Sequence, residues 1–143
     1  MKIDRYFQGQ PCWVELASVD VAVSKHFYHA LFSWDIVDMP IPQGTYSMFN
    51  LEGDDLGAMY QLPDEMMTAG DKSHWLIYFA VENLENSLVD VTGAGGTIVL
   101  GPHDVGEAGR MAVIKDLEGA KFALWQAKNH IGARRAAEAG TLC

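Results

Sequence analysis

Short stretches of alternating hydrophobic and polar residues recur along this chain, and each of them predicts a β-strand. In residues 12–17, Val14 and Leu16 fall on one face and Glu15 falls on the other. Asp20 follows as a predicted N-cap, and an apolar residue at every fourth position beyond it predicts an amphipathic helix. The expected buried stripe of this helix is Val23, Phe27 and Leu31, and further strands are predicted at residues 35–39, 46–51 and 56–62.

The second half of the chain predicts the same order of elements. A strand is expected at residues 74–81, and Asn83 is the predicted cap of a helix. The apolar stripe of that helix is Leu84, Leu88 and Val91, and the remaining strands are expected at residues 97–100, 110–115 and 120–126. Each half therefore reads as β-α-β-β-β.

The two halves also resemble each other residue by residue. Residues 36–60 recur without gaps as residues 98–122, a shift of 62 positions with seven identities among 25 pairs. For the first strand a shift of 63 is preferred, because it keeps the side chains that face the helix on the same side. Such a repeat indicates two copies of one folding unit.

Four strands with a helix on one side cannot bury both faces of their sheet, so the two copies are expected to join. The predicted fold is α+β: two βαβββ modules that form a curved eight-stranded mixed sheet, with the helices on its outer face and a trough on its inner face. The predicted organisation is a single domain over residues 1–143, with modules at 8–62 and 74–127, a polar linker at 63–73 and a tail at 128–143. Residues 128–140 of this tail are Ala-rich and predicted to be weakly helical. The residues expected in the trough are Trp13, Glu15, Met59, Gln61, Leu76, Tyr78, Ala123 and Trp125.

Composition excludes some partners. A net charge of −9 disfavours nucleic acid and anionic membrane surfaces, which attract clustered Lys and Arg. The chain has no apolar run of membrane-spanning length, and its first residues lack the apolar stretch of a secretory signal. Two distant cysteines, Cys12 and Cys143, make a poor disulfide framework, so a reducing cytoplasm is expected.

Order and residues together resemble a known family. The stretches that carry the resemblance are Cys-Trp-Val-Glu-Leu at 12–16, Phe-Tyr at 27–28, Trp-Leu-Ile-Tyr-Phe-Ala-Val at 75–81, Gly-Gly at 95–96, Gly-Arg-Met-Ala at 109–112 and Asp-Leu-Glu-Gly-Ala-Lys-Phe at 116–122. Across about residues 8–127, the chain resembles the vicinal oxygen chelate superfamily of glyoxalases, bleomycin-resistance proteins and extradiol dioxygenases. The motifs point to the fold rather than to one reaction.

Metal-dependent members of this family place one ligand on each of four strands. Carried onto this chain, those positions are Trp13, Gln61, Leu76 and Ala123, of which only Gln61 has a ligand atom. A divalent ion needs several oxygen or nitrogen donors, so no metal cofactor is expected. The alternative is a slip of two residues along two strands, which would offer Glu15 and His74 beside Gln61.

Glu15 is the best catalytic candidate. A carboxylate on an otherwise apolar face can act as a general base or can anchor a ligand. The competing interpretation pairs Glu15 with a cation such as Arg110 or Lys121. The aromatic residues beside it could stack a flat ligand or form ordinary core.

Other reactive side chains favour structural roles. Cys12 is better explained as a buried inert thiol than as a nucleophile. His26 and His29 are expected on the solvated surface of the first helix.

These observations leave three functions open. The first is a metal-free trough for a small hydrophobic or aromatic molecule, in a protein that either sequesters the ligand or transforms it with Glu15. The second is a divalent-metal enzyme, either a lyase of the glyoxalase I type or an extradiol-type dioxygenase. The third is a purely structural role. The resemblance and the unpaired edge strands also predict a homodimer.

Overall fold

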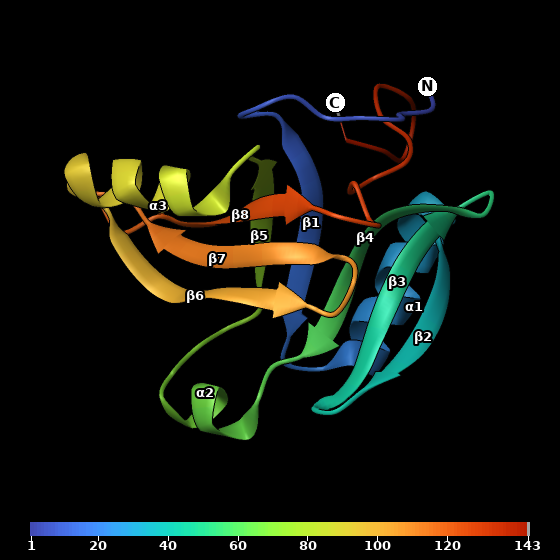
Figure 1. The fold of residues 1–143 in the computed structure, drawn as a ribbon. Helices are drawn as coiled ribbons and strands as arrows, with labels where there is room; N and C mark the ends of the chain where they lie inside the picture. The colour runs from blue at the N-terminus through green and yellow to red at the C-terminus, as the bar shows by residue number, and fades with distance from the viewer. Residues whose placement is uncertain (143) are drawn as a thin grey trace. The chain divides into compact units, whose positions relative to one another are not determined.

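The computed structural model describes residues 1–142, so that Cys143, the last residue of the predicted tail, lies outside the described residues. The strands are β1 (Pro11–Ser18), β2 (Asp35–Ile41), β3 (Gly44–Leu51), β4 (Asp54–Gln61), β5 (His74–Ala80), β6 (Thr97–Val105), β7 (Gly109–Lys115) and β8 (Lys121–Ala127) (Figure 1). The helices are α1 (Val21–Phe32), α2 (Asp64–Thr68) and α3 (Leu84–Gly93). The predicted fold class is confirmed: α+β, with eight strands in a mixed sheet.

The chain divides into two compact units. Unit 1 comprises Met1–Ile3, Val14–Trp75 and the described residues from Ala133 onward. Unit 2 comprises Asp4–Trp13 and Leu76–Gly132. The order of elements is the same in both, apart from the short α2 that follows β4.

Unit 1 has the strand order β2-β3-β4-β1, in which β1 and β4 run parallel and the other neighbours run antiparallel. Figure 1 shows α1 against one face of these strands. The core on that face contains Leu16, Trp34, Phe49, Leu56 and Met59.

The orientation of α1 differs from the sequence prediction. Asp20 does cap the helix, because its Oδ1 accepts a hydrogen bond from the Val23 amide at 3.2 Å. However, the predicted buried stripe is on the outside: Val23 is 63% exposed, Phe27 55% and Leu31 56%. Tyr28 points inward instead, with its ring 6.1 Å from those of Trp34 and Phe49 and 5.4 Å from that of Trp75. These aromatic contacts set the rotation of the helix.

Unit 2 has the strand order β5-β8-β7-β6, in which β5 and β8 run parallel. Asn83 caps α3 by accepting a hydrogen bond from the Asn86 amide, as predicted. Leu84 and Leu88 are buried, and Val91 packs against the same cluster, so the predicted stripe of α3 is confirmed. That core is completed by Val81, Ala112, Ile114 and Leu124.

The predicted linker and tail are more ordered, or ordered differently, than expected. The linker at 63–73 contains α2. The prediction of a weakly helical tail is wrong for the described part, since residues 128–142 form turns and isolated bridges. Among these, Lys2 bridges to Arg135, and the Trp34 indole donates to the Gly140 carbonyl at 2.7 Å. Tertiary contacts therefore replace helical hydrogen bonds in the tail.

Candidate functional site

A carboxylate and a phenol form a short hydrogen bond in unit 1. The Tyr46 hydroxyl on β3 donates to Glu15 Oε2 on β1 at 2.6 Å, and both residues are half-buried. Hydrogen bonds to a charged acceptor are shorter and stronger than neutral ones. Glu15 is thus held in one orientation on the sheet face opposite α1, because its neighbour Leu16 belongs to the core beneath the helix.

The register of the strands explains how this pair meets. Strand β4 lies between β1 and β3, and Ala58 is paired with Glu15 on one side and with Met48 on the other. Tyr46 is paired with Tyr60, two residues along β4 from Ala58, and its hydroxyl reaches Glu15 diagonally across β4.

Tyr60 is the third polar residue of this face. It is paired directly with Tyr46, and it lies close enough to Glu15 to be affected by its charge. Burial raises the pKa of the Tyr60 phenol, and the negative charge of Glu15 raises this pKa further. The face therefore offers a carboxylate acceptor beside a phenol that stays protonated, a combination that suits the oxygen atoms of a neutral ligand.

Two of the predicted trough residues lie on the other face. Met59 is buried in the core beneath α1. Gln61 reaches the start of α1, where its Oε1 accepts from the Val21 amide at 3.2 Å and its Nε2 donates to the Val19 carbonyl at 2.8 Å. The expectation that Met59 and Gln61 share a face with Glu15 is therefore corrected.

The cause of this error is the strand register. The gapless shift of 62 pairs Gln61 with Ala123. In the structure, the β4 partner of Glu15 is Ala58, and the β8 partner of Tyr78 is Ala123. Ala58 is thus the counterpart of Ala123. The pairing of β3 with β4 has one register irregularity, at Phe49 and Asn50, and the pairing of β6 with β7 has two. Such irregularities change which residues are structurally equivalent in the two units, although the sequence match has no gap.

The predicted trough residues of unit 2 gather as an aromatic cluster. Tyr78 and Trp125 meet edge to face at 6.3 Å, and the Tyr78 hydroxyl contacts Met111 Sδ at 3.7 Å. Trp13 meets the ring of His130 at 5.0 Å, and the Trp125 indole donates to the His130 carbonyl at 2.9 Å. Trp13, Tyr78 and Trp125 are all buried, as is Ala123, while Leu76 is half-buried.

The residues of unit 1 do not fit the metal site that the family resemblance suggests. Within residues 1–142, no three His, Cys, Asp or Glu side chains gather as a possible metal centre. In the alternative set, Gln61 is bonded at the start of α1, and His74 is exposed with its Nδ1 2.7 Å from the Lys72 carbonyl. The structure does not bring Glu15, Gln61 and His74 together.

The remaining candidates have structural partners. Arg110 pairs with Glu85 at 2.7 Å and with Asp104 at 3.2 Å. His29 Nδ1 lies 2.7 Å from the Trp34 carbonyl at the end of α1, and His26 is exposed. Burial raises the pKa of the Cys12 thiol to about 12, which suits an inert buried side chain.

Sequence reasoning missed Tyr46 and Tyr60. Both lie in strands that it predicted, and in β3 the alternation does place Tyr46 opposite the core residue Phe49. The missing information was the pairing of β3 with β4 and of β4 with β1, which a single sequence does not contain.

A comparison with known families agrees with this architecture. The model of the Glyoxalase/Bleomycin resistance protein/Dioxygenase superfamily matches residues 11–124. The chain belongs to this superfamily. The resemblance noted in the sequence is thereby confirmed.

Two curated relatives of this superfamily member are similar along most of the chain. The CFP32 protein of Mycobacterium bovis, whose name describes it provisionally as a glyoxylase, is 39% identical over 99% of this chain and 54% of its own length. The anthracycline biosynthesis protein DnrV of Streptomyces peucetius is 35% identical over 85% of this chain and 48% of its own length. The chain spans about half the length of these relatives.

Solved structures share the fold at low identity. A hypothetical protein from Bacillus halodurans aligns with a TM-score of 0.63 and 13% identity over 91% of this chain and 98% of that chain. Methylmalonyl-CoA epimerase from Mycobacterium tuberculosis aligns with a TM-score of 0.61 and 16% identity over 87% of this chain and 91% of that chain. Within residues 1–142, no helix has the length and apolar character needed to cross a bilayer.

Proposed function

We propose that this superfamily member binds a small aromatic molecule that carries a carbonyl or hydroxyl group, and that Glu15 and Tyr46 hold that group. The observation that supports this most is the 2.6 Å hydrogen bond that orients the Glu15 carboxylate. An oriented acceptor beside protonated phenols can bind an oxygen-bearing ligand with little reorganisation.

The relatives favour an aromatic ligand. DnrV and a second Streptomyces protein, DauV, are both named anthracycline biosynthesis proteins, and each is 35% identical to this chain. A hydroxylated anthraquinone is therefore the appropriate first probe. We expect 1,4-dihydroxyanthraquinone to quench tryptophan fluorescence in a saturable way. Tyr46→Phe should weaken binding about tenfold, because it removes the hydroxyl that orients the Glu15 carboxylate. Unchanged affinity in Tyr46→Phe would contradict the proposed site.

Binding and catalysis separate at Glu15. If Glu15 only binds the ligand, Glu15→Gln, which keeps the side-chain volume, should lower the affinity, and neither protein should convert the ligand. If Glu15 is a general base, Glu15→Gln abolishes turnover and leaves much of the binding intact. The measurement is a titration of both proteins with the probe, followed by chromatography of the incubated ligand for a product.

A metal-dependent lyase is the second candidate, because the mycobacterial relative at 39% identity is named as a glyoxylase. It conflicts with the placement of Gln61 and His74 described above. Elemental analysis of protein purified without chelator decides between the two candidates. Stoichiometric nickel, zinc, iron or manganese would favour the lyase.

We further propose that the chain works as a homodimer in a reducing cytoplasm. The exposed stripe of Val23, Phe27 and Leu31 supports self-association, since exposed contiguous apolar residues commonly mark interfaces. Light scattering at micromolar concentration tests this, and Phe27→Ser should lower the measured mass. A monomer in the unmodified protein would exclude the dimer.

A further inference from the structure

A hollow lies in unit 1, on the α1 side of the strands and away from Glu15. Its volume is about 210 Å³, and its walls are mainly apolar. The strands and the end of α1 contribute Val14, Phe32, Trp34, Phe49, Leu56 and Gly57, and the end of the described chain contributes Gly140, Thr141 and Leu142. For comparison, an apolar protein cavity of about 150 Å³ stays dry and binds benzene.

The two polar side chains on these walls already have partners. The Trp34 indole N–H donates to the Gly140 carbonyl at 2.7 Å. The Thr141 hydroxyl donates to the Glu138 carbonyl at 2.7 Å and accepts from the Glu138 amide at 3.1 Å. A charged or strongly polar ligand would lose its hydration without replacement there, whereas an uncharged apolar ligand would not.

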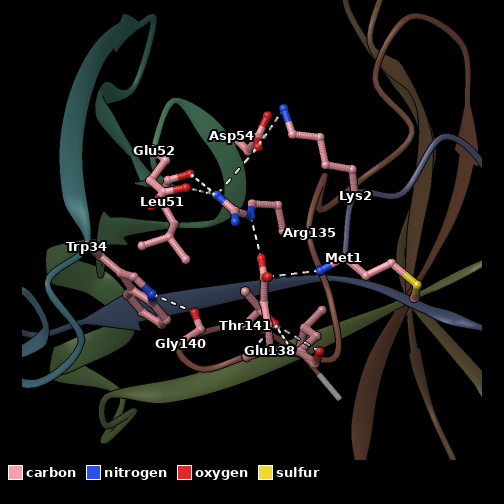
Figure 2. A network of polar contacts seen from close by, with 11 residues as sticks. Met1, Lys2, Trp34, Leu51, Glu52, Asp54, Arg135, Glu138, Gly140 and Thr141 are labelled. Atoms are coloured by element: carbon pink, nitrogen blue, oxygen red, sulfur yellow. Dashed lines mark hydrogen bonds and ion pairs between the residues drawn. The ribbon is translucent and has the colours of Figure 1, made fainter.

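The segment from Ala133 to Leu142, called the strap here, is held in place by backbone hydrogen bonds of Arg134 and Ala136 and by ion pairs of Arg135 and Glu138 (Figure 2). The Arg135 guanidinium donates to Glu138 within the strap and to Glu52 Oε2, after β3, at 2.6 Å. It also lies 3.9 Å from Asp54, whose carboxylate is 3.5 Å from Lys2 Nζ. None of these charged residues lines the hollow, so the part of the strap that covers it, from Gly140 to Leu142, makes none of these ion pairs.

We propose that this hollow is a binding site for one small, uncharged apolar molecule of benzene to naphthalene size, and that the strap closes over it with Arg135 as its latch. The site is separate from the Glu15 face, because Val14 and Leu16 alternate with Glu15 along β1. The ligand stacks against Phe32, Trp34 and Phe49 and displaces no ordered hydrogen bond. Ligand exchange requires the strap to lift, which the Arg135 contacts oppose.

The test uses naphthalene as the probe and 5-fluorotryptophan in place of all four tryptophans. The fluorine resonance of Trp34, assigned with Trp34→Phe, reports on the hollow. We expect it to shift in a saturable way, including in a Glu15→Gln background. A Trp34 resonance that does not move up to the solubility limit of naphthalene would overturn the proposal.

A variant that fills the hollow can be compared with a control that carries the same substitution elsewhere. Leu142→Trp places an indole at the wall and should weaken naphthalene binding about tenfold or more at the Trp34 resonance. Val89→Trp adds the same side chain on an exposed position of α3 and should change nothing there. Equal affinity in Leu142→Trp and Val89→Trp, both folded by circular dichroism, would refute the assignment of the site.

The latch is tested separately. Arg135→Gln should speed the release of naphthalene several-fold, measured by exchange broadening of the Trp34 resonance. Arg134→Gln removes the same charge from an exposed neighbouring side chain and is the control. Identical release rates in the two variants would eliminate the gating role of Arg135.

Discussion

The Tyr46 hydroxyl donates to Glu15 Oε2 at 2.6 Å, although the two residues belong to strands that are not neighbours. The contact crosses β4, where Tyr46 is paired with Tyr60 and Glu15 is paired with Ala58. Three strands thus determine one carboxylate position. A carboxylate fixed by packing binds a ligand at a lower entropic cost than a mobile one.

Glu15→Gln should lower the pKa of the Tyr60 phenol, because it removes the nearby negative charge that adds to the effect of burial. The pKa should remain above the ordinary value, since burial is the larger cause. Because folding raises this pKa, the stability that depends on neutral Tyr60 is fully present below the ordinary pKa of tyrosine and is lost as pH rises through the folded value.

The measurement is the ultraviolet absorbance of tyrosinate during an alkaline titration, with Tyr60→Phe to isolate the Tyr60 component. Glu82→Gln, at an exposed position of unit 2, is the control. A Tyr60 titration that is identical in Glu15→Gln and Glu82→Gln would disprove the coupling.

The rotation of α1 predicts opposite effects for two phenylalanines. Phe49→Ala should lower the free energy of unfolding by roughly 3–5 kcal/mol, because Phe49 is fully buried in the unit 1 core. Phe27→Ala should change it by no more than about 0.5 kcal/mol, because Phe27 is 55% exposed. Urea titrations of dilute protein measure the free energy of unfolding of both variants. Comparable decreases would mean that α1 buries the face that carries Phe27.

Gly132→Ala should destabilise the protein more than Gly119→Ala. Both glycines have positive φ, +123° for Gly132 and +93° for Gly119, so each substitution carries a backbone cost of about 1–2 kcal/mol. A Cβ at Gly132 would also lie 2.3 Å from the Cys12 carbonyl oxygen, whereas one at Gly119 meets nothing within 4 Å. The overpacking should add roughly 1–3 kcal/mol, measured as a difference in urea midpoints. Equal midpoints would argue against the close approach.

Cys12 should be unreactive in the folded protein. Burial raises the pKa of its thiol to about 12, so at pH 8 the thiolate fraction is on the order of one in ten thousand. In a Cys143→Ser background, Ellman's reagent should label no thiol until denaturant is added and one thiol afterwards. Rapid labelling of the native protein at pH 8 would contradict this burial.

The sequence predicted best what depends on neighbouring residues. The side chains of the caps Asp20 and Asn83 each accept a hydrogen bond from the amide three positions ahead. This interaction is local, so the residue type is enough to predict it. In α3 the side chains outside the predicted stripe are polar apart from that of Val89, so the sequence of the helix itself indicated the buried face. In α1 both faces carry apolar residues, so the choice depended on distant partners of Tyr28 such as Trp75, which periodicity does not reveal.

The candidate site was predicted only in part. Glu15 was identified by its own alternation within β1, which needs no partner strand. Tyr46 and Tyr60 were missed, and Met59 and Gln61 were assigned to the wrong face, because register irregularities shift the residues of β4 relative to a simple count. The ligand-binding roles of Trp13, Leu76, Tyr78 and Trp125 remain predictions.

The position of Gln61 has a consequence for motion in unit 1. Its amide joins the last residue of β4 to the first turn of α1, 40 positions earlier in the chain. A shift of α1 along its axis would break the two hydrogen bonds of the Gln61 amide before it disturbed the core. Ligand binding in unit 1 should therefore leave α1 in place, and any adjustment on binding should come from side chains or from the strap.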